Sequence, residues 1–193
     1  MIPAPAVVHV AVVRGPETAD RATRTAAGRV ALRALAAELV GADPADVTVR
    51  ARCATCGGAH GRPVLGGSRA LDGLHASVAH AGGLVVVAVS PDGPIGIDAE
   101  PRGREAPPGT TLAEWVRVEA VLKTDGRGLL VDPSLVRVEG DATGMTAWIE
   151  GEAARYRLVD VSLGSDLVVA IARRGLGELD ARIQDPAGPG SDI

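Results

Sequence analysis

The most informative stretch of the sequence runs from Ile95 to Gly128 and reads IGIDAE over residues 95–100 and WVRVEAVLK over residues 115–123. The first segment follows a turn signal at Asp92-Gly93 and is apolar up to its carboxylates, which predicts a strand over Pro94–Asp98. The second segment predicts a helix. Three acids and one lysine are therefore expected on a strand end and on the helix that follows it.

This helix has clear signals at both ends. Thr111 is a good N-cap, and Glu114 three residues later completes a capping box. Gly126 suits the C-terminal cap, so the helix is predicted to end at about Lys123 or Thr124.

Asp98 and Glu100 are candidate metal ligands. Alternate residues of an extended chain share a face, so the two carboxylates point the same way. Two oxygen donors with a third from elsewhere suit Mg²⁺, which prefers oxygen ligands and keeps several waters. The alternative interpretation is a solvated strand end before a proline turn.

Glu119 and Lys123 lie on one face of the predicted helix with Trp115, because residues four apart are neighbours. An ordinary ion pair between them is one interpretation. However, Lys123 is the only lysine among 20 basic residues. A compact ammonium suits one phosphate oxygen, whereas arginine would serve an ion pair equally well. This composition favours a phosphate-binding role for Lys123.

The rest of the chain predicts short strands and one more long helix. That helix is Ala22–Val40, with Gly41 beyond its end. The Gly- and Pro-rich segment Cys53–Gly67 predicts a loop. The predicted strands are Val7–Val13, Val47–Arg52, Leu84–Val89, Leu135–Val138, Met145–Ile149, Arg155–Val161 and Leu167–Ala172.

These elements indicate an α+β fold in which the second half faintly repeats the first. The apolar run after Gly82-Gly83 has an echo in the run after Gly164. We therefore expect two similar lobes, residues 1–92 and 93–184, with a site in the cleft between them. Residues 185–193 are expected to form a flexible tail.

Composition limits the classes of function. The net charge is −4, so a general nucleic-acid surface is not expected. Residues 1–92 carry nine arginines against seven acids, and residues 93–193 carry eleven basic residues against seventeen acids. The first half thus suits anions and the second half cations. No membrane span or signal peptide is recognised, and we expect a reduced, cytoplasmic monomer.

Two further candidate sites involve histidine and cysteine. His80 precedes Gly82-Gly83, where a ligand could approach the backbone closely, although a structural histidine is the alternative. Cys53, Cys56 and His60 provide at most three zinc ligands. A small zinc-binding domain is therefore a competing hypothesis.

Several motifs, in the order in which the family carries them, resemble those of the Sfp-type 4′-phosphopantetheinyl transferases. GIDAE at 96–100 is followed by a W-x-x-x-E-A-x-x-K pattern at 115–123 and a G-x-G pattern at 126–128. Upstream, HGRP at 60–63 resembles the family's Gly-Lys/Arg-Pro loop, and SVAHAG at 77–82 resembles its Ser-x-Ser-His-Ser-Gly segment. Arg24 and Arg33 lie where the family carries arginines. The matches cover roughly residues 20–172.

The resemblance implies a pseudo-dimeric α+β fold of two similar lobes. It also implies an enzyme that moves the phosphopantetheine arm of coenzyme A to a serine of an acyl or peptidyl carrier protein, releasing 3′,5′-ADP. By position, the metal ligands for Mg²⁺ would be Asp98, Glu100 and Glu119. Glu119 would also accept the serine proton.

The same resemblance assigns the substrate-binding residues. Lys123 and His80 would bind phosphate oxygens of coenzyme A. Arg62, Arg33 and Arg24 would hold the nucleotide and its 3′-phosphate.

The chain departs from the family pattern in three places. Val118 stands where the family usually has lysine, and the loss of one phosphate contact would cost about 1.5–3 kcal/mol unless Arg117 compensates. The segment between Glu100 and Trp115 is shorter than the family's usual helical insertion, and alanines flank His80. These departures support the alternative of a weak or inactive relative that binds coenzyme A or a carrier protein.

Overall fold

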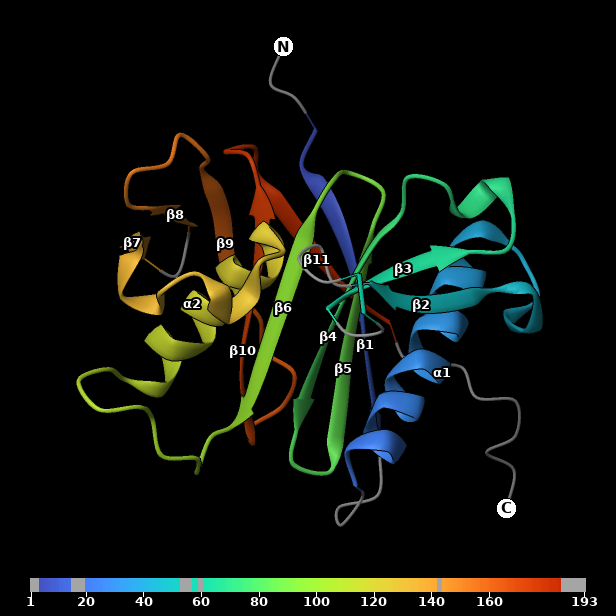
Figure 1. Cartoon of the computed structure of the whole chain (residues 1–193), viewed down its shortest axis with the longest axis horizontal. Helices are drawn as coiled ribbons and strands as arrows, with labels where there is room; N and C mark the ends of the chain where they lie inside the picture. The colour runs from blue at the N-terminus through green and yellow to red at the C-terminus, as the bar shows by residue number, and fades with distance from the viewer. Residues whose placement is uncertain (1–3, 15–19, 53–56, 59–60, 142–143, 185–193) are drawn as a thin grey trace.

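The computed structural model describes residues 4–14, 20–52, 57–58, 61–141 and 144–184 (Figure 1). In these residues the chain forms two α-helices and eleven strands. The helices are α1 (Arg21–Val40) and α2 (Leu112–Asp125). The strands are β1 (Ala6–Arg14), β2 (Thr48–Arg52), β3 (Arg62–Gly66), β4 (His75–Ala81), β5 (Leu84–Ser90), β6 (Ile95–Pro101), β7 (Val136–Asp141), β8 (Gly144–Ile149), β9 (Tyr156–Asp160), β10 (Leu167–Arg174) and β11 (Leu179–Gln184).

The strands form two large sheets and a hairpin. One sheet has the order β11-β1-β5-β4, the other has the order β6-β10-β9-β8-β7, and β2 pairs with β3. The β1–β11 pair is parallel, and the other named strand pairs are antiparallel. The predicted α+β class is confirmed. The predicted likeness between two lobes, and their boundaries, stay predictions.

Each large sheet is covered by one helix, as Figure 1 shows for α1 and α2 on either side of the central strands β4, β5 and β6. Alternation along β5 explains this packing: Val85, Val87 and Val89 join the core beneath α1, whereas Val86 and Ala88 face the opposite way. The opposite faces of both sheets share a third core, which also contains Ile97 of β6. The two sheets are thus joined by buried apolar side chains.

The edge strands β4 and β6 lie next to each other where the two sheets meet. No ladder joins them among the described strand pairs. Hydrogen bonds that involve side chains connect them instead. In one of these, Ser77 Oγ of β4 accepts from the backbone N–H of Ile97 in β6 over 3.0 Å. We call this junction the seam.

Helix α2 packs directly on β6 because Gly96 has no side chain. A Cβ on Gly96 would lie 2.2 Å from the carbonyl oxygen of Ala120 and 2.5 Å from the nitrogen of Thr124. Gly96 therefore faces α2, and the alternation of β6 places Asp98 and Glu100 on the same face. In this way the strand register sets both acids beneath the helix.

The end signals of both helices are confirmed. Thr111 and Glu114 form the predicted capping box, and Gly126 closes α2 with a φ of 98°. Gly41 closes α1 with a φ of 68°. These positive φ angles favour glycine, which has no Cβ to clash.

The sequence-based predictions were wrong or incomplete at three strands. Part of the predicted 53–67 loop is β3, which pairs with β2 from Arg62 opposite Arg52 to Gly66 opposite Thr48. Strands β4 and β11 were not predicted. Strand β11, from the second predicted lobe, pairs with β1 from the first. The predicted tail over 185–193 lies outside the described residues.

Candidate functional site

The candidate site lies at the seam, beneath α2. Strand β6 supplies Asp98 and Glu100, α2 supplies Glu119 and Lys123, and β4 supplies His80. The Lys123 ammonium joins these elements, because it contacts Asp98 directly and interacts electrostatically with Glu119 and His80. The structure thus brings four of the predicted residues into one electrostatic network, and Glu100 is linked to it through Arg104.

Lys123 is held by three oxygens. Its Nζ donates to Asp98 Oδ1 over 2.6 Å, to the carbonyl of Ile97 over 3.1 Å and to the carbonyl of Val78 over 3.3 Å. An ammonium has three rotatable donors, whereas the guanidinium of arginine is a planar fork. This contact explains structurally why a lysine stands here: it ties β4 to β6, and its ion-pair partner is Asp98 rather than Glu119.

Asp98 and Glu119 form a coupled pair of acids. Asp98 is only 4% exposed, and its Oδ2 is buried without a hydrogen-bond partner among the described residues. Burial raises the pKa of Asp98, although Lys123 opposes this shift. Burial also raises the pKa of Glu119, and the nearby charge of Asp98 raises it further. An added cation would stabilise both carboxylates.

Glu100 is paired with an arginine that sequence reasoning missed. Its carboxylate accepts from the Arg104 guanidinium in the turn after β6. The Arg104 charge also acts to lower the pKa values of Asp98 and Glu119. Two sequence signals could have found it: the spacing of four residues from Glu100, and its place in the short segment before α2.

The three predicted metal ligands are not arranged as a ready-made centre. In the part of the chain that the structure describes, no three His, Cys, Asp or Glu side chains gather as a metal-binding group. Asp98 points its Oδ1 at Lys123, and Glu100 pairs with Arg104. The chemistry of the donors nevertheless fits Mg²⁺, because all are carboxylate oxygens and Asp98 Oδ2 lacks a partner.

His80 packs against α1 at Gly28. A Cβ on Gly28 would lie 3.5 Å from His80 Cε1, which is an ordinary van der Waals contact, and 3.2 Å from Val78 Cγ1, which is a tight one. Partial burial lowers the pKa of His80, and the charges of Lys123 and Arg24 lower it further. These effects favour the neutral ring at pH 7. Arg24 on α1 lies within electrostatic reach of this site.

The other predicted arginines lie differently. Arg62 Nη2 donates to the carbonyl of Lys123 over 3.0 Å and also to that of Thr124, so it caps the end of α2. Arg33 is exposed on α1 and lies about 180° around the helix from Arg24. The structure therefore does not bring Arg33 to the seam.

Val118 packs against the core beneath α2, and its neighbour does not replace the missing lysine. Arg117 pairs with Asp160 at the end of β9, with 3.0 Å from Nε to Oδ1. The compensation by Arg117 that the sequence left open is therefore not seen in this arrangement. Cys53, Cys56 and His60 lie outside the described residues, so the zinc hypothesis stays untested.

Comparisons with known proteins assign no class to this chain. No protein-family model matches it, and no curated protein gives a significant match. Within the described residues, neither helix has the length and apolar character needed to cross a membrane.

Proposed function

We propose that the chain is a Mg²⁺-dependent 4′-phosphopantetheinyl transferase that acts on coenzyme A and a carrier-protein serine. The observation that carries this proposal is Asp98, a buried acid with one unpartnered oxygen, coupled to Glu119 and contacted by Lys123. The proposal includes a pseudo-dimeric α+β fold of two lobes.

In the proposed reaction, the serine hydroxyl oxygen attacks the phosphorus next to the pantetheine arm. The bond from that phosphorus to the bridging oxygen breaks, and 3′,5′-ADP leaves with the electron pair. Mg²⁺, held by Asp98, Glu100 and Glu119, would neutralise the diphosphate charge. Glu119 would also accept the serine proton, directly or through water.

The basic residues of the site would position the substrate. Lys123 is 29% exposed and its three N–H donors are taken by Asp98 and two backbone carbonyls, so in this arrangement it would act on a phosphate oxygen through its charge. His80, in its favoured neutral form, would donate a hydrogen bond rather than a charge. Arg24 would contribute a positive charge from α1.

One observation favours the alternative of a relative that binds without catalysis. Arg117 pairs with Asp160, so the charge missing at Val118 is not restored from the next position. Such a protein would bind coenzyme A or a carrier protein without transferring the arm.

The deciding experiment is mass spectrometry of apo carrier proteins incubated with the chain, coenzyme A and Mg²⁺. Carrier proteins of fatty acid, polyketide and nonribosomal peptide synthesis should all be tried. We expect addition of phosphopantetheine to at least one, its loss with EDTA, and its loss in Glu119→Gln. If none is modified, the activity is refuted; tight binding of coenzyme A that Glu119→Gln leaves unchanged would support the binding-only alternative.

A further inference from the structure

The turn after β6 places a cation beside the acidic site. The backbone N–H of Arg104 donates to the carbonyl of Pro101 over 2.8 Å, which fixes the position of this residue just beyond the strand. Its guanidinium pairs with Glu100. The Arg104 side chain is 49% exposed, whereas that of Glu100 is 10% exposed. In this ion pair the Arg104 side chain is therefore exposed to solvent, and the Glu100 side chain is buried.

The two cations of the site differ in how firmly they are held. Lys123 has two backbone carbonyls in addition to Asp98. Arg104 is held to the site through Glu100 and is half exposed to water. Water can solvate the half-exposed Arg104 guanidinium when it leaves, whereas the buried Glu100 carboxylate needs another cation in its place. Arg102, nearby in the same turn, is instead fixed by the carbonyls of Ser165 and Leu167.

We propose that Arg104 is an exchangeable internal counter-ion of the acidic site. It neutralises Glu100 until a divalent cation binds that carboxylate and displaces the guanidinium. The released guanidinium then binds a phosphate oxygen of the substrate. It supplies the positive charge that a lysine would carry at position 118, where this chain has valine. The second step rests on the proposed function, whereas the exchange at Glu100 requires only that the site binds a divalent cation.

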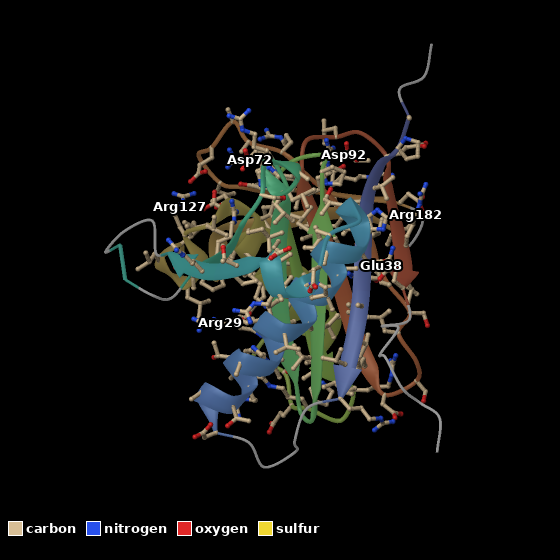
Figure 2. All side chains as sticks on the ribbon, turned by 90° about the vertical axis from the view of Figure 1, so that its right-hand side faces the viewer. Arg29, Glu38, Asp72, Asp92, Arg127 and Arg182 are labelled. Carbon is tan, nitrogen blue, oxygen red and sulfur yellow. The ribbon has the colours of Figure 1, made fainter. Side chains whose placement is uncertain are left out.

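The test compares Arg104→Gln with Arg182→Gln, which removes the same charge elsewhere. Arg182 pairs with Asp180 within β11, and Figure 2 shows it on the opposite side of the molecule from Arg127, which closely follows α2. Mn²⁺ binding without coenzyme A is measured by water-proton relaxation. Coenzyme A binding is measured by calorimetry with saturating Mg²⁺. Thermal unfolding checks that each variant is folded.

We expect Arg104→Gln to bind Mn²⁺ about threefold more tightly than the unaltered protein, the size of effect of losing a competing surface ion pair. Coenzyme A should bind about tenfold more weakly, because one charge-assisted phosphate contact is lost. Arg182→Gln should change neither affinity. In a Glu100→Gln background, Arg104→Gln should tighten Mn²⁺ binding less, because only the longer-range effect of the Arg104 charge on Asp98 and Glu119 is then removed.

Several results would overturn this proposal. Unchanged or weaker Mn²⁺ binding in Arg104→Gln would show a fixed structural pair, and absence of Mn²⁺ binding in every variant would remove the site itself. Tighter Mn²⁺ binding with unchanged coenzyme A affinity would refute the transfer of Arg104 to phosphate. Opposite shifts in the two affinities, without carrier-protein modification, would uphold the exchange and refute the proposed transferase.

Discussion

Replacing Lys123 with methionine tests how much the Lys123 contacts that join β4 to β6 contribute to stability. Methionine keeps an unbranched side chain but removes the ammonium that contacts Asp98 at 2.6 Å and the carbonyls of Ile97 and Val78 at 3.1 and 3.3 Å. Asp98, only 4% exposed, would then be a buried charge without its counter-ion. We expect the main cost to come from this acid.

The expected magnitude follows from burial. Removing one partner of a buried ion pair costs about 3–5 kcal/mol. Lys123 is 29% exposed, so water can replace part of its contact, and the lower end applies. We expect Lys123→Met to lower the free energy of unfolding by about 3 kcal/mol at pH 8. For a chain of this size that corresponds to a fall in Tm of about 6–12 °C.

The cost should depend on pH in a defined direction. Burial already raises the pKa of Asp98, and the loss of Lys123 would raise it further. Between the ordinary aspartate pKa and this raised value, the folded variant holds a proton that the unfolded chain has released. Its stability therefore falls as the pH rises through that window. The cost of Lys123→Met should be smaller near pH 4 than at pH 8.

Urea unfolding at several pH values, with Asp98→Asn and the double variant, completes the test. The double variant should recover about 2 kcal/mol relative to Lys123→Met, since no buried charge remains. A cost below about 1 kcal/mol at pH 8, or one that does not change with pH, would refute the reasoning. So would a double variant no more stable than Lys123→Met.

Three further predictions concern α2. Gly96→Ala should force α2 away from β6, because the added Cβ would lie 2.2 Å from the carbonyl oxygen of Ala120. We expect the free energy of unfolding in urea to fall by about 2–3 kcal/mol. An unchanged urea midpoint would contradict the close packing of α2 on β6. Thr111→Ala removes the cap and should cost about 1 kcal/mol, measured by calorimetry against the neighbouring Thr110→Ala, which should cost less. Burial and the charge of Asp98 raise the pKa of Glu119 in the metal-free protein, and a divalent cation binds the ionised carboxylate, so Mn²⁺ binding should weaken as the pH falls from 8 to 5. An Mn²⁺ affinity that is the same at both pH values would contradict this reasoning.

The sequence predicted those features that depend on neighbouring residues. Both ends of α2 were predicted because the Thr111–Glu114 capping box and Gly126 are local signals. Strand β4 was missed because its sequence, HASVAHA, has few residues that favour strands, and its pairing with β5 stabilises it. Strand β11 pairs with β1 from the far end of the chain, a partner that no local pattern reveals.

The sequence predicted which residues form the candidate site, but it did not predict the contacts that these residues make. The face shared by Asp98 and Glu100 follows from the period of a strand, so it could be expected. The carbonyl partners of Lys123 belong to the backbone of two strands, and backbone groups leave no sequence signature. Arg62 matched a substrate-binding motif, yet it caps the C-terminal end of α2, because the orphan carbonyls there attract a cation.

The parallel pair of β1 and β11 has a consequence for protein synthesis. Ala6 faces Leu179 in this pair, so the outer edge of β1 stays open on the ribosome until nearly the whole described chain has emerged. An open, apolar strand edge can pair with another chain. Premature termination before residue 179 would leave β1 exposed permanently, and such fragments should aggregate even though both helices and the site residues are already present.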